Sequence, residues 1–387
     1  MTARPVLRVK PREGKRARAG APWLFSNEID MPKGLAPGAV VNVTADDGRS
    51  FGTGVFNPKS LIAVRLFDPA PDVALDEDFF AAKLGRALKL RESFYPAPYY
   101  RLVHAEGDGL PGLVIDRFGD SVVVQITAAG MEALKDTLLA ALQRVLAPAR
   151  IILRADAPAR SLEGLDSYVD AEGSGRISVE ENAVTYFADA AAGQKTGWYY
   201  DQRDNRAFMA ALAKDKSVLD AYSYTGGFAL AAAKAGARDV AGLESSAPAV
   251  AFAEEAAAVG HLAAKFIRCD VFEELERLGA AKETFGVVIA DPPPFVKAKK
   301  DLETGAKAYR KLARLAAAVT APEGFLFVAS CSHNIGMDRL AFECATGIAR
   351  SGRRLRLIRA SGASPDHPIH PMLPESAYLK ALVYALD

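Results

Sequence analysis

The sequence predicts an α/β protein in three parts: a small β-barrel, a central α+β domain, and a C-terminal domain built on a parallel sheet. Three observations support this prediction. The chain has 387 residues, which is too many for one core at about 100–200 residues per domain. Residues 38–67 hold short strand patterns around turns, as in a small barrel. From Ala207 onward, apolar runs alternate with Ala-rich helical stretches, which is typical of a parallel sheet with crossover helices.

The composition is that of an ordinary folded chain, because 50% of the residues are hydrophobic and 25% are charged. Three cysteines in so long a chain argue against a disulfide framework and for a reducing compartment. No apolar run approaches the roughly 18–20 residues of a membrane span, and the basic start lacks the apolar core of a secretory signal. We therefore expect a cytoplasmic protein without a membrane partner. The net charge of +1 averages over domains and can hide local patches.

The first part, residues 1–72, combines strand patterns with a basic segment. Residues 6–10 alternate in the manner of a strand, and the Asp-Gly pair at 47–48 is a tight-turn signal. Residues 4–18 carry seven basic side chains and a single acid. Such a cluster is a nucleic-acid patch, an organelle transit peptide or a solvated edge. The strand pattern argues against the transit peptide.

The central part, residues 73–190, mixes helical and strand periodicity. Helical spacing of apolar residues covers 75–94 and 131–146. The strands are expected at residues 101–116, 121–127, 150–153, 177–180 and 183–189.

In the third part, residues 191–387, successive strands end in acidic side chains. The carboxyl ends of parallel strands meet at one edge of a sheet, where open α/β proteins bind their ligands. A single acid there is usually a helix cap or a turn residue, but four in register would repel one another without a ligand. The four acids are Asp220, Glu244, Asp270 and Asp291. We therefore expect a ligand site at this edge.

The loop after Asp220 narrows the choice of ligand. It runs through Tyr222 to a Gly-Gly pair at Gly226, and such glycines let a ligand approach the backbone closely. It matches neither the G-x-G-x-x-G pattern nor a P-loop, so a pyrophosphate cradle is missing. Glu244, 24 residues after Asp220, suits the two ribose hydroxyls, and Asp270 suits an exocyclic adenine amine. A nucleoside without phosphates fits best, and S-adenosylmethionine (SAM) is the obvious candidate.

Three prolines follow Asp291 and fix an extended loop directly after a buried strand. Such a loop can present Asp291 and backbone carbonyls to a flat base beside a methyl donor. The plain alternative is a stiff connection.

Cys331 follows the fifth apolar run and would face the same cleft as Asp291. A lone cysteine is usually a small buried hydrophobe, and this is our interpretation of Cys269 and Cys344. A thiolate that adds to carbon 6 of a pyrimidine activates carbon 5 to take a methyl group. Cys331 therefore suits covalent catalysis.

The lysine and histidines near the predicted cleft have either functional or purely structural interpretations. Acids oppose a thiolate unless a cationic partner lowers its pKa, and Lys297 is one candidate partner. His333 either tunes the thiol or has a capping or surface role. His367 and His370 are spaced like two metal ligands, but prolines surround them and no thiol or acid cluster joins them. No metal is therefore expected.

Stretches in all three parts resemble one family. They are residues 22–29 (PWLFSNEI), 106–117 (EGDGLPGLVIDR), 195–206 (KTGWYYDQRDNR), 366–368 (DHP) and 378–380 (YLK). Residues 217–334 resemble class I SAM-dependent methyltransferases. The whole chain resembles the bacterial 23S ribosomal RNA cytosine-5 methyltransferases with an N-terminal PUA domain.

The resemblance implies a PUA barrel over residues 1–72, a central α+β domain over 73–190 and a Rossmann-like catalytic domain over 191–387. It also implies that Cys331 is the nucleophile and that Asp291 belongs to the catalytic loop. The donor-binding residues that it implies are Gln202, Asp220, Tyr222, Gly226, Glu244, Asp270 and Asp291.

Within this set, the resemblance assigns different parts of the donor to different residues. Glu244 and Asp270 would hold the ribose and the adenine. Gly226 would lie beneath the methionine portion, and Gln202 would reach the amino-acid end. The chain departs from the family at Pro294, where a lysine is common, and at residues 333–334, where a Gly-Leu pair is common.

The sequence thus predicts a SAM-dependent enzyme that forms 5-methylcytosine in large-subunit ribosomal RNA. It predicts no metal and leaves a homodimer open. Two alternatives remain: methylation of a guanine nitrogen, as in relatives that lack the cysteine, and a non-catalytic RNA-binding ribosome assembly factor. Cys331 is the residue that separates cytosine from guanine chemistry.

Overall fold

The computed structural model describes residues 4–171, 173–193 and 196–387. Lys195, which belongs to one of the family-like stretches, lies outside the described residues. The chain forms two compact units. The first unit comprises Met1–Ile177, Asp189–Trp198 and Pro365–Ser376, and the second comprises Ser178–Ala188, Tyr199–Ser364 and Ala377–Asp387.

The N-terminal part of the first unit is a five-stranded sheet with the order β1-β3-β4-β5-β2. Its elements are β1 (Val6–Arg8), α1 (Lys15–Arg18), β2 (Trp23–Leu24), β3 (Ala39–Thr44), β4 (Ser50–Phe56) and β5 (Val64–Asp68). Alternate apolar residues such as Val41 and Val43 turn inward and are fully buried. Gly52 has a φ of +109°, and a Cβ there would lie 1.9 Å from the Asp68 carbonyl oxygen, so only glycine fits.

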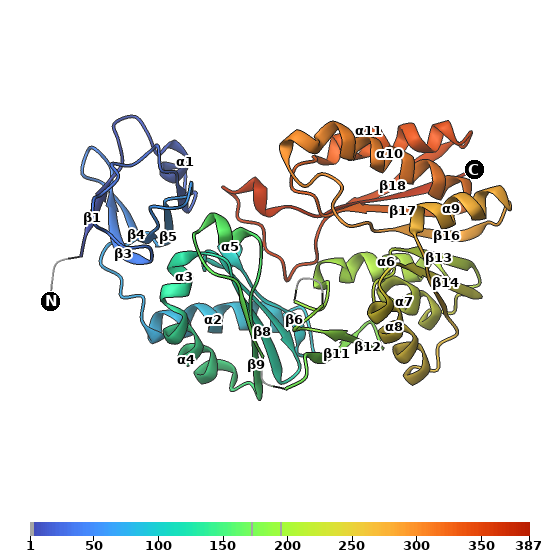
Figure 1. The fold of residues 1–387 in the computed structure, drawn as a ribbon, viewed down its shortest axis with the longest axis horizontal. Coiled ribbons are helices and arrows are strands. Elements are labelled where there is room, and N and C mark those ends of the chain that lie inside the picture. The colour runs from blue at the N-terminus through green and yellow to red at the C-terminus, as the bar shows by residue number, and fades with distance from the viewer. Residues whose placement is uncertain (1–3, 172, 194–195) are drawn as a thin grey trace. The chain divides into compact units, whose positions relative to one another are not determined.

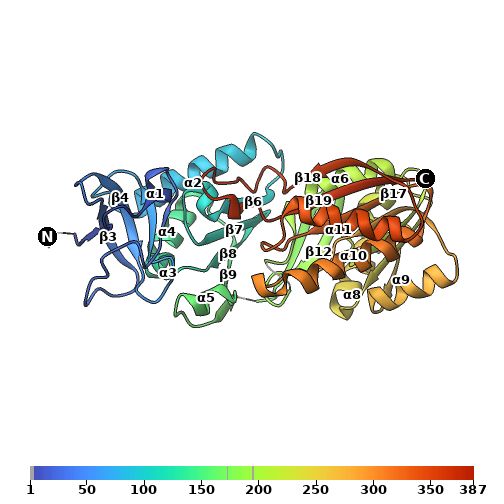
Figure 2. The same ribbon diagram turned by 90° about the horizontal axis from the view of Figure 1, so that it is seen from above.

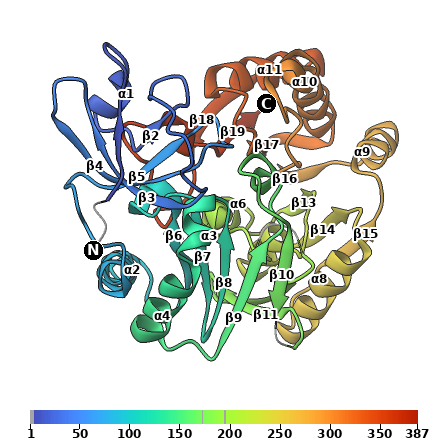
Figure 3. The same cartoon turned by 60° about the vertical axis from the view of Figure 1, so that its left-hand side comes forward.

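The second sheet of the first unit has the order β10-β9-β8-β7-β6, and α2 and α4 pack on it through one apolar cluster (Figure 3). Its strands are β6 (Tyr99–His104), β7 (Leu113–Phe118), β8 (Ser121–Ile126), β9 (Arg150–Ala155) and β10 (Tyr168–Ala171). Its helices are α2 (Glu77–Glu92), α3 (Ala129–Ala133), α4 (Lys135–Leu146), α5 (Ala159–Leu162) and the 3-10 turn η1 (Ala105–Asp108).

Two predicted elements of this sheet are divided in the structure. The strand expected over residues 101–116 breaks into β6, η1 and β7, because Gly109 and Gly112 adopt positive φ angles of 67° and 73° and turn the chain. The helix expected over 131–146 begins earlier and is interrupted at Leu134, which ends α3 and precedes α4 with a φ of −102° and a ψ of 9°.

The hairpin of β11 (Arg176–Glu181) and β12 (Val184–Asp189) forms a two-stranded sheet of its own. The sequence analysis placed it in the central part. In the structure, most of its residues group with the second unit.

The second unit is built on a seven-stranded sheet with the order β15-β14-β13-β16-β17-β19-β18 (Figure 1). The parallel strands are β13 (Ser217–Ala221), β14 (Asp239–Glu244), β15 (Lys265–Arg268), β16 (Phe285–Ala290) and β17 (Thr320–Ser330). The antiparallel end of the sheet contains β18 (Leu355–Ser361) and β19 (Lys380–Leu386). The predicted α/β fold class is confirmed.

Helices cover both faces of this sheet. They are α6 (Arg203–Leu212), α7 (Gly227–Lys234), α8 (Ala247–Val259), α9 (Val271–Ala280), α10 (Leu302–Ala318) and α11 (Met337–Arg350). Alternate residues of one strand serve the two faces: Val287 packs with α6 and α7, whereas Val288 packs with α9, α10 and α11. Figure 2 shows α10 and α11 lying side by side. Two-sided burial explains the apolar runs in β16 and in the second half of β17, residues 325–329.

The sheet order creates a switch point between β13 and β16. The chain goes outward from β13 through β14 to β15 and then returns to β16 on the other side of β13. The connections therefore diverge at the carboxyl ends of these two strands, and ligands of open α/β sheets bind at such a position.

Within the described residues, no helix is both long and apolar enough to cross a membrane.

Candidate active site

The switch point brings together three of the predicted acids and the cysteine. Asp220 lies in β13, Glu244 ends β14, Asp291 directly follows β16, and Cys331 directly follows β17. The parallel register ties the strand ends to one another, since the Asp291 amide lies 3.4 Å from the Ala221 carbonyl oxygen. The four side chains therefore belong to one edge of the sheet.

Asp220 is fully buried and has one hydrogen bond, in which the Ala229 amide donates to Oδ2 over 2.9 Å. Its Oδ1 atom has no hydrogen-bond partner among the described residues. Burial raises the pKa of Asp220 to about 7, and the nearby charges of Asp291 and Glu244 act in the same direction. A buried oxygen that the protein does not satisfy is an acceptor available to a ligand.

The loop from β13 to α7 has an unusual backbone. Tyr222 and Tyr224 adopt positive φ angles of 68° and 49°, a conformation that costs energy for residues other than glycine. Gly226 has a φ of 83°, and a Cβ there would come within 3.0–3.2 Å of three side chains. The hydroxyls of Ser223 and Thr225 are buried without a described hydrogen-bond partner. The loop thus presents further unsatisfied polar atoms beside Asp220.

Glu244 holds this loop. Its Oε2 atom accepts from the Tyr224 amide over 2.9 Å, and its Oε1 atom accepts from the Ser246 amide over 2.8 Å. The Ser245 hydroxyl also donates to Oε1 over 3.3 Å, so Oε2 is the oxygen that keeps a second lone pair for a ligand.

Asp270 has a structural role in addition to any binding role. Its side chain accepts from the Glu273 amide over 3.0 Å and caps α9. Asp270 also acts on Tyr222 electrostatically. Burial raises the pKa of Tyr222, and the negative charges of Asp270 and Glu244 raise it further.

A chain of hydrogen bonds leads from β18 to Asp291. The Ser361 hydroxyl donates to Asn205 Oδ1 over 2.8 Å, and Asn205 Nδ2 donates to Gln202 Oε1 over 2.7 Å. Gln202 Nε2 then donates to Asp291 Oδ2 over 2.9 Å. The resemblance assigns Gln202 to the donor's amino-acid end, and in the structure its side-chain amide donates to Asp291.

Cys331 is partly exposed at the end of β17. The hydroxyls of Ser330 and Ser332, the residues on either side of it, lie 2.7 and 3.2 Å from the Tyr309 hydroxyl. Burial raises the pKa of Tyr199, and the charges of Cys331 and Asp291 both raise it as well. Tyr199 is therefore within electrostatic reach of the thiol and of the acid, so these two groups share one neighbourhood.

Sequence reasoning missed Lys380, the first residue of β19. The structure shows Lys297, the cation that we expected near Cys331, as exposed. Lys380 is instead buried, and its Nζ atom donates to the Ser332 carbonyl over 2.6 Å. Lys380 belongs to the family-like stretch 378–380, but no local pattern places it near Cys331, because the strand pairing of β17 and β19 joins residues far apart in the chain.

The histidines fall into ordinary environments. The His333 ring lies against Tyr378, with centroids 5.4 Å apart. His367 pairs with Asp366 over 2.7 Å and is buried. Among the described residues, no group of three or more His, Cys, Asp or Glu side chains could hold a metal ion.

Fold and site together define a class of protein. Residues 161–385 match the family described as S-adenosylmethionine-dependent methyltransferase, and residues 7–69 match a PUA-like domain. A protein described as a SAM-dependent methyltransferase from Streptococcus mutans has the same fold, with a TM-score of 0.82 and 21% identity over 98% of this chain and 100% of that one. A methyltransferase solved with SAH reaches a TM-score of 0.84 with the same identity and coverage. The protein is SAM-dependent, and the unsatisfied acceptors around Asp220 fit such a donor.

Curated relatives narrow the class. The chain is 36% identical to ribosomal RNA large subunit methyltransferase I of Shewanella denitrificans, over 97% of this chain and 98% of that protein. It is also 36% identical to the protein of the same name from Aliivibrio fischeri, over 95% of each chain. The chain belongs to this family of SAM-dependent methyltransferases.

Proposed function

We propose that this protein transfers a methyl group from SAM to carbon 5 of a cytosine in large-subunit ribosomal RNA, with Cys331 as the nucleophile. The substrate follows from relatives whose names specify large-subunit ribosomal RNA and which match nearly the whole chain. The observation that carries the chemistry is the position of Cys331 directly after β17, at the same sheet edge as Asp291. Such a substrate implies action in the bacterial cytoplasm.

The chemistry needs a thiolate because carbon 5 of cytosine is too weak a nucleophile by itself. The Cys331 sulfur forms a bond to carbon 6, and the electron pair of the C5–C6 double bond moves toward carbon 5. Carbon 5 then takes the methyl group, while the electron pair of the broken S–CH3 bond stays on the donor sulfur. A base removes the carbon 5 proton, the double bond forms again, and the thiolate leaves.

We propose that the donor occupies the loops around Asp220. The unsatisfied atoms of Asp220, Ser223 and Thr225 support this position, because buried polar atoms without partners are rare in folded proteins. The residues assigned to the donor are Gln202, Asp220, Tyr222, Gly226, Glu244, Asp270 and Asp291. Asp291 would contribute to the donor site and also face the target base, and Gln202 would hold it in place.

We propose that the PUA-like residues 1–72 serve RNA binding and that residues 191–387 carry out catalysis. The basic segment at the start of the chain supports RNA binding, but only some of its seven basic residues are available for phosphates. Arg4, Lys10, Arg16 and Arg18 are engaged with acceptors of the protein itself. Its other basic residues, Arg8, Arg12 and Lys15, are exposed and are the ones we assign to phosphates.

The test is covalent trapping with RNA that carries 5-fluorocytosine. Fluorine at carbon 5 cannot leave as a proton does, so the adduct persists and is seen as a gel shift that survives denaturation. Wild-type protein with SAM should form the adduct, and Cys331→Ala should not. Cys269→Ala is the matched control, because burial raises the pKa of Cys269 to about 11 and it should leave trapping unchanged.

Methyl transfer by the Cys331→Ala variant would show that the nucleophile is assigned wrongly. A methylated guanine in digested RNA would instead support the nitrogen chemistry, and no transfer by wild type to any large-subunit RNA would favour an assembly factor. The target base must be unpaired or flipped, since carbons 5 and 6 both have to be reached.

A further inference from the structure

Lys380 is a buried lysine for which the chemistry above has no role. Only 7% of its surface is exposed. Lysine is rarely this buried without a paired charge, and no carboxylate among the described residues forms an ion pair with it. A buried ammonium without a paired charge contributes little to the stability of the fold, so its position calls for another explanation.

The strand pairing fixes where this ammonium lies. Lys380 stands opposite Ser330 in the antiparallel register of β17 and β19. Its Nζ atom donates to the carbonyl of Ser332, two residues further along. The side chain therefore runs alongside the backbone from Ser330 to Ser332, and the residue between these two is Cys331.

The groups around Cys331 are mostly acidic or neutral. Tyr199, which precedes η2 (Tyr200–Gln202), and Tyr309 of α10 both interact electrostatically with the thiol. Asp291 follows β16, and His333 follows Cys331 itself within the same loop. Lys380 is the one basic side chain of this set apart from His333.

We infer that Lys380 is a positioning residue that holds Cys331 as a thiolate, a role that rests on the proposed function of Cys331. Its ammonium stabilises the sulfur anion before RNA binds. The proton of the thiol is released to solvent, so Lys380 itself stays charged throughout the reaction. A cation beside a cysteine is an established way to lower a thiol pKa.

The electrostatics of Lys380 agree with this geometry. Burial lowers the pKa of Lys380, and the charge of Cys331 opposes that shift. By reciprocity, the ammonium stabilises the thiolate by the same interaction.

The test is the pH dependence of Cys331 alkylation by iodoacetamide, followed by mass spectrometry of the peptide that contains it. Cys331 is partly exposed, so the reagent has access. Lys380→Gln keeps a donor for the Ser332 carbonyl but removes the charge. We expect it to move the midpoint of the alkylation profile up by about one pH unit and to slow alkylation at pH 7 about tenfold.

Lys380→Arg is the matched variant, because it keeps the cation, and its profile should stay within about twofold of wild type. A Lys380→Gln profile that coincides with wild type would overturn the inference. Equal slowing by both variants would overturn it too, because shape rather than charge would then matter. Cys344 is fully buried, so the peptide that contains it reports on general unfolding, and its alkylation should be the same in all three proteins.

This assay uses neither RNA nor SAM, so its result is separate from that of the trapping experiment. Failed trapping with a shifted alkylation profile would count against the cytosine chemistry alone. Successful trapping with an unshifted profile would count against Lys380 alone.

Discussion

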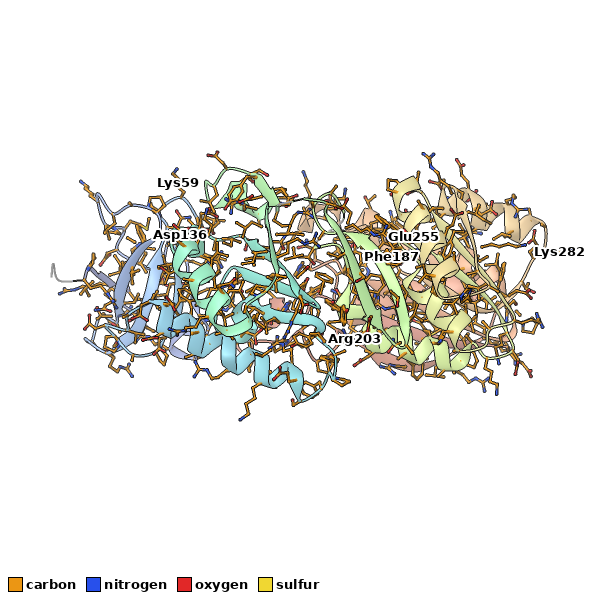
Figure 4. The ribbon with its side chains drawn as sticks, turned by 90° about the horizontal axis from the view of Figure 1, so that it is seen from below. Lys59, Asp136, Phe187, Arg203, Glu255 and Lys282 are labelled. Atoms are coloured by element: carbon orange, nitrogen blue, oxygen red, sulfur yellow. The ribbon has the colours of Figure 1, made fainter. Side chains whose placement is uncertain are left out.

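Buried carboxylates occur in both units of the chain, but their partners differ. In the first unit, Arg101 meets Asp116 through two hydrogen bonds of 2.8 Å, and Arg91 meets Asp108 through bonds of 2.6 and 2.7 Å. In the second unit, Asp220 is just as buried and has one backbone donor and an unsatisfied oxygen. Charged side chains at the surface, such as Asp136 and Lys282 in Figure 4, simply point into solvent.

The difference separates structural acids from binding acids. A two-pronged arginine–carboxylate pair satisfies both partners, so it fixes the fold and leaves nothing for a ligand. An acid with a single donor keeps an acceptor free, at the cost of a raised pKa. Burial alone therefore does not mark a binding acid, and we expect burial without an arginine hydrogen bond to mark one. Three variants test this distinction.

Arg101→Met should have the largest effect. It leaves Asp116 buried with only the Thr196 hydroxyl as a described side-chain partner, and removing one member of a buried pair typically costs about 3–5 kcal/mol. Urea denaturation followed by circular dichroism measures the loss. The control is Arg277→Ala, which breaks an exposed pair with Glu274 and should leave the transition unchanged. A loss for Arg101→Met no greater than that for the control would refute the structural role.

Glu244→Gln should have an intermediate effect, and on binding rather than on folding. The amide keeps an acceptor for one of the loop amides but loses the charge that we assign to the ribose hydroxyls. Hydrogen bonds to charged groups are worth about 1.5–3 kcal/mol, so the Kd for SAM should rise roughly 10- to 100-fold. Isothermal titration calorimetry gives this number. An unchanged Kd would remove Glu244 from the donor site.

Asp220→Asn should act in the opposite direction, because it should stabilise the donor-free protein. The folded-state pKa of Asp220 is about 7, against an ordinary value of 3.8, so the folded state holds a proton that the unfolded state releases. Stability from this group is present below about pH 4 and is lost as the pH rises toward 7. Asparagine cannot ionise, so the donor-free variant should be more stable than wild type at pH 8, by about 4 kcal/mol for a shift of roughly three pKa units.

The same Asp220→Asn comparison at pH 4 is its control. The wild-type carboxyl is then protonated in the folded state, and the difference between the two proteins should vanish. Thermal unfolding at both pH values tests this. A variant that is less stable than wild type at pH 8 would show that Asp220 is a structural acid like Asp116.

Much of the site was predictable because it follows strand ends. Asp220, Glu244 and Asp291 each lie at or directly after a buried apolar run, and parallel strands bring such positions to one edge. Cys331 was predictable for the same reason. Asp270 was found by the same rule, but the structure also gives it the ordinary role of capping α9.

Other features depend on pairing between distant residues. The contact from Lys380 to Ser332 spans 48 positions, and the bond from Gln202 to Asp291 spans 89. The exposed position of Lys297 is equally invisible to local patterns. No spacing rule predicts which of several lysines ends beside a cysteine.

The sequence by itself determined the α/β class, the acids at the strand ends and the cysteine. Hydrophobic periodicity and the residues that end each apolar run are local properties, so they can be recognised in short stretches of sequence. Only the tertiary structure decided which buried acids are paired with arginine, which lysine approaches Cys331 and which amide orients Asp291. Those outcomes depend on sheet order and strand register, which bring together side chains that no local interaction connects.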